Sequence, residues 1–466
     1  MKLGKLLAAG LAMVMSVTGA VSALTVTAAD PAPQMRDIST MELVHDMGIG
    51  INLGNTLESA GDWIKQWSDG SVHAYETAWG SPDVTKEMIQ GYADEGFGVL
   101  RIPVAWTNRM QDDGTYTIDQ EWMDRVTQVV DWTLEANMYA IVNIHWDYGW
   151  MNEYPENHDE CLNRFTRYWE QIAAHFQDYG DHLMFEAQNE ELGWNTVWNR
   201  WGGTDGKDRA YALVGEVNQR FVDTVRASGG NNAKRHLLIS GYNTDVELTC
   251  DPMFIIPDDP AGRLAVSVHY YTPAGFAILT EDADWGKASR TWGTPQEIAE
   301  LTRNMDLLKT TFIDKGIPVI IGEYGCPLEN KDMDSVRLFL SSVCREAYSR
   351  QLCPVLWDTT GNVYDRSACR ISDAQIKAAY AEIAGDNIPA NKSLPDTPDP
   401  GAEPADPVPG DVNADGVLNV LDLVLFQKWL IGTPDTVLTD AEAGDLCADG
   451  VLDVYDLCLM KRELAG

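Results

Sequence analysis

Short apolar runs recur along residues 50–358, and segments with helical spacing separate most of them. The runs are continuous rather than alternating, and there are eight: GINLG (50–54), VLRIPV (99–104), YAIVNIHW (139–146), LMFEAQ (183–188), HLLISGY (236–242), LAVSVHYY (264–271), IPVIIGEYG (317–325) and PVLWD (354–358). Such runs are typical of strands that are buried on both faces, as strands are in parallel sheets. We therefore predict eight parallel strands.

The segments between the runs predict helices. In residues 119–137 the large apolar side chains fall on one helical face, and Asp119 stands where an N-cap is expected. These side chains are Trp122, Val126, Val129, Val130 and Leu134. Between the fifth and sixth runs there is room only for a short or irregular connection. Eight strands with helical crossovers favour a closed (β/α)8 TIM barrel over a doubly wound sheet.

Residues 386–410 contain seven prolines and almost no large apolar side chains. A segment of this composition cannot bury a core, so we expect an extended, semi-stiff linker. It divides the chain into a large α/β body at 30–385 and a small tail at 411–466.

The strongly negative net charge of the chain makes negatively charged partners unfavourable. The formal net charge is −37 and the pI is about 4.4, which argues against nucleic acid and anionic membranes as partners.

Residues 1–29 have two lysines, then an apolar stretch, then small residues, which predicts a signal peptide and a secreted protein. No later segment predicts a membrane span. The eight cysteines show no tight pairing pattern and leave disulfides open.

Polar residues gather at the carboxyl ends of the predicted strands, where barrel enzymes carry their catalytic groups. They are Arg101, His145, Glu190, His269, Glu323 and Asp358. Glu190 follows the fourth strand and Glu323 lies at the end of the seventh, so the two carboxylates should face each other across the barrel mouth. Glycoside hydrolysis needs two such carboxyl groups on either side of the bond that is cleaved.

The motifs GINLGNTLES, LRIPVAW, NIHWD, FEAQNE, SVHYYTP, VIIGEYG and LWD, in this order, resemble glycoside hydrolase family 5, and the first resembles its cellulase branch. The resemblance implies a retaining double displacement with Glu190 as acid/base and Glu323 as nucleophile, about 5 Å apart. It implies sugar-binding or supporting roles for six further residues: Arg101, His145, Asn189, His269, Tyr271 and Trp357. Glu186 and Glu191 have no matching role.

The proposed roles set expectations for ionisation. Glu323 must be ionised to attack, and Arg101 and Tyr271 should depress its pKa. Glu190 must begin protonated, so we expect its pKa to be raised by burial and nearby negative charge. Two carboxylates supply both the nucleophile and the proton transfer, so we expect no metal or organic cofactor in catalysis.

The sequence leaves the substrate open. The resemblance favours an endo-β-1,4-glucanase acting on cellulose or related β-glucans, with a monomeric catalytic domain. The same pair of carboxylates serves enzymes of xyloglucan, mannan, xylan or mixed-linkage glucan. A non-catalytic glycan-binding component is a further alternative, against which the two carboxylates argue.

The tail contains an internal duplication. DVNADGVLNVLD (411–422) and DLCADGVLDVYD (445–456) are offset by 34 residues and place oxygen groups at positions 1, 3, 5, 9 and 12 with glycine at 6, as in a calcium-binding loop. The predicted ligands are Asp411, Asn413, Asp415, Asn419 and Asp422 in the first loop and Asp445, Asp449, Asp453 and Asp456 in the second. Cys447 occupies position 3 of the second loop, and sulfur is a poor calcium ligand.

The prolines before the first loop preclude an entering helix, so this is not an ordinary EF-hand. A duplicated calcium loop with only the following helix resembles a dockerin module, a small all-α domain. The resemblance implies structural Ca²⁺, binding to the cohesin module of a scaffoldin, and an extracellular, cellulosome-associated location.

Overall fold

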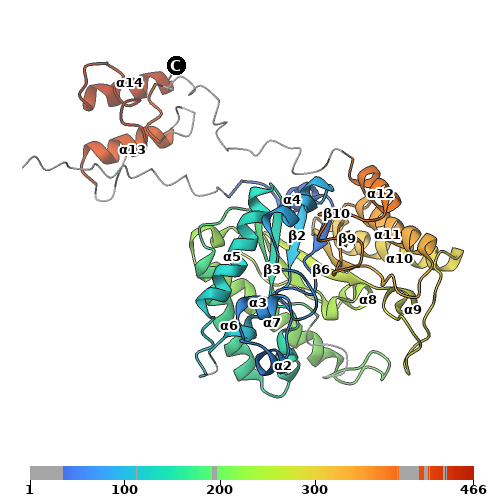
Figure 1. Cartoon of the computed structure of the whole chain (residues 1–466). Coiled ribbons are helices and arrows are strands. Elements are labelled where there is room, and N and C mark those ends of the chain that lie inside the picture. Colours follow the sequence, from blue (N-terminus) through green and yellow to red (C-terminus); the bar gives the residue numbers. More distant parts are fainter. Residues whose placement is uncertain are drawn as a thin grey trace, which may run out of the picture. The chain divides into compact units, whose positions relative to one another are not determined.

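The computed structural model describes residues 35–111, 113–190, 197–385, 387, 409–413, 418, 420–433, 436 and 438–465 (Figure 1). The chain forms two compact units, Met1–Ser393 and Leu394–Gly466. The predicted signal peptide and most of the predicted linker lie outside the described residues.

The first unit is built on a closed barrel of eight parallel strands, and β8 pairs with β1 to complete the ring. The strands are β1 (Gly50–Asn52), β2 (Val99–Ile102), β3 (Tyr139–Asn143), β4 (Leu183–Glu186), β5 (Leu237–Ser240), β6 (Leu264–Tyr270), β7 (Val319–Tyr324) and β8 (Cys353–Leu356). Every residue in these strands is buried, which explains their continuous apolar sequence. The predicted (β/α)8 barrel is confirmed.

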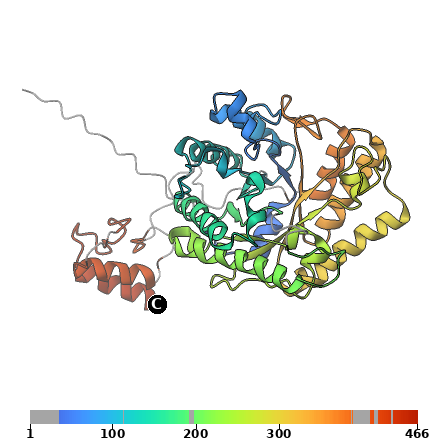
Figure 2. The same cartoon turned by 90° about the horizontal axis from the view of Figure 1, so that it is seen from below.

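Helices surround the strands and follow one another around the barrel in sequence order (Figure 2). The main ones are α4 (Lys86–Asp94), α5 (Gln120–Glu135), α6 (His158–His175), α7 (Lys207–Ala227), α10 (Pro295–Thr311), α11 (Met333–Tyr348) and α12 (Ala374–Ala384). The predicted cap of α5 is present, because the Asp119 carboxylate accepts a hydrogen bond from the Trp122 amide. Between β5 and β6 there is only the short turn η4 (Tyr242–Thr244) and α8 (Val246–Thr249), as predicted.

Helix α1 (Thr40–Met47) closes the amino-terminal end of the barrel. Its buried Leu43, Val44 and Met47 form one cluster with strand residues that include Val99 and Met184. Because these side chains fill the amino-terminal end, the functional groups lie at the opposite end, where the strands terminate.

Shorter elements complete the connections of the barrel. They are α2 (Asp62–Trp67), α3 (Val72–Glu76), η1 (Trp106–Arg109), η2 (Asp147–Glu153), η3 (Gly230–Ala233), α9 (Ala274–Ala277), η5 (Ile313–Lys315) and the hairpin of β9 (Tyr364–Asp365) and β10 (Arg370–Ile371). In the described part of the chain, no helix is long and apolar enough to cross a membrane.

The second unit contains α13 (Val420–Leu430) and α14 (Val454–Ala465), and each helix begins in the last residues of one copy of the repeated loop. Its small core is formed by Val412, Phe426, Leu438, Leu457 and Met460. The described residues 409 and 410 before the first loop are not helical, as the prolines predict. All eight cysteines of the chain carry free thiols.

Candidate active site

The strand ends bring the predicted site residues together at the carboxyl end of the barrel. Strand register sets Asn52 opposite Arg101, Asn143 opposite Glu186 and His269 opposite Glu323. Residues just beyond the strands complete the group: His145 after β3, Asn189 and Glu190 after β4, Tyr271 after β6 and Trp357 after β8.

Arg101 lies at the centre of a buried network and is itself inaccessible to solvent. Its Nη1 donates to Glu323 Oε1 at 2.8 Å and to Asn52 Oδ1 at 3.0 Å. Its Nη2 donates to Asn189 Oδ1 at 2.9 Å, and its Nε donates to Glu186 Oε2 at 2.7 Å. One guanidinium therefore fixes groups from β1, β4, β7 and the loop after β4, as its rigid fork of donors allows.

Glu186 belongs to this network, although the sequence predicts no role for it. It is fully buried, and besides Arg101 it accepts hydrogen bonds from Ser267 Oγ at 2.8 Å and Asn143 Nδ2 at 3.0 Å. The sequence does contain a signal for the pairing of Glu186 with Arg101. Alternation along a strand places Arg101 and Glu186 on the barrel side of β2 and β4, two residues beyond the interior residues Val99 and Met184. Two buried charges at that depth have to pair.

Glu190 and Glu323 face each other across His269. The imidazole Nδ1 lies 2.7 Å from Glu190 Oε1 and 3.6 Å from Glu323 Oε2. The potential ligand atoms of the three side chains all lie within 4.8 Å of one another. Glu323 also accepts a hydrogen bond from the Tyr271 hydroxyl at 2.9 Å. The spacing matches the roughly 5 Å of a retaining pair and is shorter than the about 6.5–9.5 Å of an inverting pair.

The two carboxylates differ in exposure: the Glu190 side chain is 45% exposed and that of Glu323 only 7%. Burial favours the protonated form of a carboxyl group, whereas hydrogen bonds and nearby cations favour its ionised form. The ionisation of each group therefore depends on which effect is larger.

The expected directions of both pKa shifts are wrong for the ligand-free site. Burial acts to raise the pKa of Glu190, but the hydrogen bond and charge of His269 outweigh it and leave that pKa below its ordinary value. Burial also raises the pKa of Glu323, and the charges of His269 and Arg101 offset this only in part.

His145 and Trp357 form an aromatic wall of the site. Their rings are parallel within 6° at a centroid distance of 5.8 Å. Burial and the nearby charges of Arg101 and His269 hold the pKa of His145 well below its ordinary value, so this imidazole is neutral. A neutral, buried imidazole behind an indole stiffens the face on which a sugar ring can stack.

Further tryptophans expose large ring faces on the loops after β1 and β3. Trp63, Trp67, Trp79 and Trp146 are all at least one third exposed, and Trp146 stacks on Tyr148. Exposed aromatic surface of this extent is a usual mark of a binding groove. In contrast, Trp106 is fully buried and belongs to the core.

The two loops of the second unit contain the same hydrogen bond at equivalent positions. The amide of position 3 donates to the position 12 carboxylate, from Asn413 to Asp422 and from Cys447 to Asp456. Asp422 and Asp456 are both fully buried. This arrangement orients the last carboxylate toward the loop, as oxygen coordination of calcium requires.

The predicted ligands of the two loops are only partly described. Asp445, Cys447 and Asp449 bring one potential ligand atom each to within 4.8 Å of one another. Asp453 follows in the same loop, and Asp411 begins the first one. Asp415 and Asn419 of the first loop, and Glu191 of the first unit, lie outside the described residues. The donor set of the described positions fits calcium, apart from the Cys447 sulfur.

A (β/α)8 barrel with two facing carboxylates at its mouth defines the chain as a glycoside hydrolase. Its sequence matches the family described as cellulase, glycosyl hydrolase family 5, over residues 57–362, and the dockerin type I domain over residues 409–465. The chain belongs to glycosyl hydrolase family 5 and carries a carboxyl-terminal dockerin type I domain.

Curated relatives and solved structures agree with this assignment. Endoglucanase B of Clostridium cellulovorans is 31% identical, covering 91% of this chain and 90% of its own length. A xyloglucan-specific endo-beta-1,4-glucanase of Bacteroides ovatus is 35% identical over 74% of this chain and 70% of its own. The structure of a broad specificity endoglucanase from an uncultured bovine rumen ciliate, 37% identical, superposes with a TM-score of 0.67 over 74% of this chain and 98% of its own.

Proposed function

We propose that this enzyme is an endo-β-1,4-glucanase that cleaves internal bonds of cellulose or a related β-glucan with retention of configuration. The spacing of Glu190 and Glu323 carries this proposal, because ligand atoms within 4.8 Å fit the roughly 5 Å of a retaining pair and not the about 6.5–9.5 Å of an inverting pair. Relatives named endoglucanase support the choice of β-1,4-glucan.

In the first proposed step, an ionised oxygen of Glu323 attacks the anomeric carbon of the sugar stacked on Trp357. A bond forms between this oxygen and the carbon while the glycosidic bond breaks, and Glu190 gives its proton to the departing oxygen. Glu323 suits the nucleophile because Arg101 and Tyr271 hold its two oxygens separately. Fixed donors keep it aimed at the carbon.

In the second proposed step, Glu190 acts as a base. It takes a proton from a water that attacks the anomeric carbon from the side of the departed sugar, and the bond to Glu323 breaks. Its exposure suits this role, since both the leaving group and the water must reach it. Two inversions return the original anomer, so the product retains its configuration.

The remaining predicted residues position these groups. Asn189 is assigned to the sugar 2-hydroxyl, and its carboxamide is oriented for this by the bond from Arg101. His269 is assigned to the exchange of the Glu190 proton, on the strength of its 2.7 Å contact. His145 supports the Trp357 face.

A second candidate keeps this chemistry but changes the polymer to xyloglucan, mixed-linkage glucan, mannan or xylan. The Bacteroides ovatus relative is by name xyloglucan-specific, and a similar solved structure, 32% identical with a TM-score of 0.68, is named a lichenase, from Caldicellulosiruptor sp. F32. Assays of new reducing ends on a panel of these polysaccharides separate the candidates. Release from none of them would leave a non-catalytic glycan-binding protein and overturn the proposal.

We further propose an export and docking role for the rest of the chain. Residues 1–29 are the signal peptide, 30–385 the catalytic domain, 386–410 the linker and 411–466 the dockerin. In the dockerin, Ca²⁺ is held by the predicted oxygen ligands of the two loops, and the folded module binds a cohesin of an extracellular scaffoldin. The dockerin match over residues 409–465 supports this placement on a cellulosome. Titration with a cohesin module, with and without calcium, tests it.

A further inference from the structure

The two copies of the calcium-type loop in the second unit differ at position 3. The first copy has Asn413 there and the second has Cys447, although positions 4–8 read ADGVL in both. The bond from the position 3 amide to the position 12 carboxylate is also kept, at 3.2 Å in the first copy and 3.0 Å in the second. The exchange therefore replaces an oxygen donor by sulfur and leaves the framework of the loop in place.

The donor set of the second loop does not fit calcium. Ca²⁺ takes roughly 6–8 oxygen ligands, and the side chain at position 3 supplies one of them. Cys447 offers a soft sulfur instead, which calcium binds poorly and zinc binds well. We therefore expect the oxygens that remain in this loop to hold Ca²⁺ more weakly than the first loop does.

The spacing of the donor atoms in the second loop suits zinc. Asp445, Cys447 and Asp449 bring one potential ligand atom each to within 4.8 Å of one another. The Cys447 Sγ lies 3.7 Å from Asp445 Oδ1. Zinc bonds of about 2.3 Å to sulfur and about 2.1 Å to oxygen, at a tetrahedral angle, place the two donor atoms about 3.6 Å apart. One zinc ion could therefore be bound by both side chains with little movement of either.

Backbone amides of the loop hold its carboxylates in place. Asp445 accepts from the Asp449 amide at 3.1 Å and from the Gly450 amide at 2.7 Å. Gly450 has a φ of 79°, in the left-handed region that glycine adopts at little cost, and so allows the tight turn behind these bonds. Asp449 accepts from the Val451 amide at 2.8 Å. A donor set that is already ordered loses little freedom when an ion binds.

The site can be reached from solvent. Cys447 and Asp449 are both exposed, so an ion can enter without an opening of the unit. Three protein ligands leave the fourth tetrahedral position to a water molecule, as in zinc sites that are not closed. Zinc is bound by the thiolate form of cysteine, so the Cys447 thiol gives its proton to solvent when the ion binds.

We propose that the second loop is a site for a thiophilic divalent cation, Zn²⁺, bound by Asp445, Cys447 and Asp449, whereas the first loop is a site for Ca²⁺. The inference rests on the proposed docking role, because it assumes that both loops are metal sites of a dockerin. Zn²⁺ carries the same charge as Ca²⁺, so it offsets the repulsion between the acidic side chains of the tail equally well. The two halves of the duplication therefore differ in the metal that they select.

Labelling of the unaltered full chain with iodoacetamide, followed cysteine by cysteine with mass spectrometry, tests the site. The chain is kept in excess Ca²⁺, and labelling rates are compared with and without added Zn²⁺. We expect Zn²⁺ to slow labelling of Cys447 about tenfold or more, because a thiolate bound to metal is a poor nucleophile. Cys458, the other exposed thiol of the same unit, is the internal control and should change less than about twofold.

This measurement reports on one sulfur atom. In the described part of the chain, Glu190, His269 and Glu323 form another group of three potential ligands. Zinc bound there would add to a simple count of bound ions but would leave the labelling of Cys447 unchanged.

A variant that copies the first loop supplies the second test. Cys447→Asn restores an oxygen at position 3, so calorimetric titration with Ca²⁺ should find one strong site in the wild type and two in the variant. Cys458→Ser, on α14, is the matched control and should keep one strong Ca²⁺ site.

The outcomes separate this inference from the proposed function. Zn²⁺ that slows neither Cys447 nor Cys458, or slows both equally, would overturn the inference, as would two strong Ca²⁺ sites in the wild type. Each of these results leaves a calcium-binding dockerin intact. A wild-type chain without any Ca²⁺ site would instead overturn the proposed docking role.

Discussion

The Nδ1 of His269 lies 2.7 Å from Oε1 of the Glu190 carboxylate. This contact links the proposed acid to a second titratable group. It explains why burial does not raise the pKa of Glu190 in the ligand-free site. The proposed exchange of a proton between these two residues has consequences that can be measured.

The two carboxylates should respond differently to the leaving group. Glu190→Ala should cripple cleavage of cellulose but spare formation of the glycosyl-enzyme from an aryl glycoside with an acidic phenol, which departs without a proton. Azide should then restore turnover and give a β-glycosyl azide. Glu323→Ala removes the nucleophile, so no leaving group rescues it, and azide entering directly should give the α product. Product anomers identified by NMR check both variants, and swapped anomers would mean reversed roles.

His269→Asn should shift the pH profile of kcat/KM. The acid limb reports protonation of the nucleophile, and the pKa of Glu323 is already raised by burial, with His269 and Arg101 offsetting part of the rise. Removal of the imidazole charge raises that pKa further, so the acid limb should move to higher pH. His158→Asn is a suitable control, because this half-exposed histidine pairs with Glu216 on the outside of the barrel. An acid limb that stays in place would contradict the assignment of His269.

Glu186→Ala should destabilise the barrel, because it leaves Arg101 with one buried carboxylate instead of two. Removing one partner of a buried ion pair typically lowers the free energy of unfolding by about 3–5 kcal/mol. Both Arg101 and Glu186 are fully buried. Glu170→Ala breaks the exposed pair with Arg167 and should cost less than about 1 kcal/mol. Denaturant unfolding of the two variants checks the difference, and similar midpoints would show that Glu186 contributes little.

Calcium should affect docking and not hydrolysis. Residues 395–466 carry 15 acidic and 3 basic side chains, so the metal-free tail repels itself, and bound Ca²⁺ would offset this charge. Chelation should therefore abolish cohesin binding and leave hydrolysis of a soluble glucan within about twofold, because a ligand stabilises only the unit that binds it. The double variant Asp422→Ala and Asp456→Ala should mimic chelation, whereas Glu442→Ala, outside both loops, should not. Equal loss of binding and hydrolysis would contradict two independent units.

The strands could be predicted because parallel strands that are buried on both faces have continuous apolar sequences. All eight strands fall where the apolar runs predict them. The site network was predictable only in part. Arg101 stands out as a charge in an apolar run, but its link to Glu186 depends on which strands neighbour its own in the closed ring. The pKa directions of Glu190 and Glu323 depend on distances of a few ångströms to His269, which no local pattern encodes.

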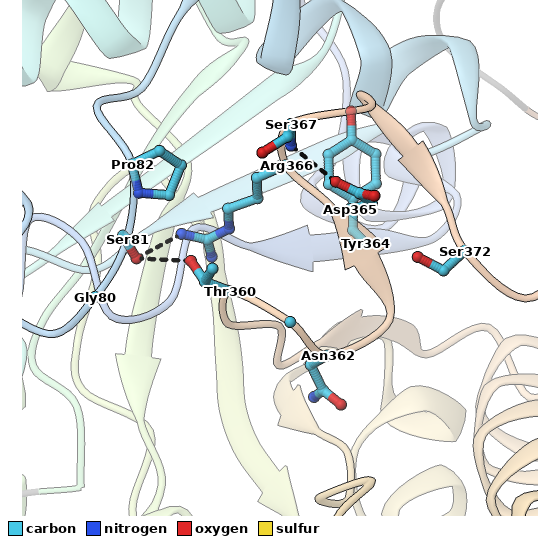
Figure 3. A pocket seen from close by; sticks show the side chains of 11 residues that line it. Gly80, Ser81, Pro82, Thr360, Asn362, Tyr364, Asp365, Arg366, Ser367 and Ser372 are labelled. Carbon is cyan, nitrogen blue, oxygen red and sulfur yellow. Dashed lines mark hydrogen bonds between the residues drawn. The ribbon is translucent and has the colours of Figure 1, made fainter.

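A cavity between the loop after β1 and the loop after β8 (Figure 3) was not predictable from the sequence for a related reason. Its two sides, around Ser81 and Asn362, are far apart along the chain and meet only because β8 pairs with β1. Neither segment has a composition that sets it apart from other polar loops. Closure of the barrel creates the feature.

The ring closure of the barrel, where β8 pairs with β1, is reinforced by the buried side chain of Arg366. This side chain joins Gly54 across 312 positions and Thr56 across 310, beside the seam where β8 meets β1. Both carboxylates precede that seam in the sequence, so an incomplete chain ending after Glu323 already contains them, but its first strand has an open edge. Pairing across such long sequence separations is slow, because the entropy of closing the intervening loop opposes it. We therefore expect a chain that ends before β8 to lack activity, although it contains both carboxylates.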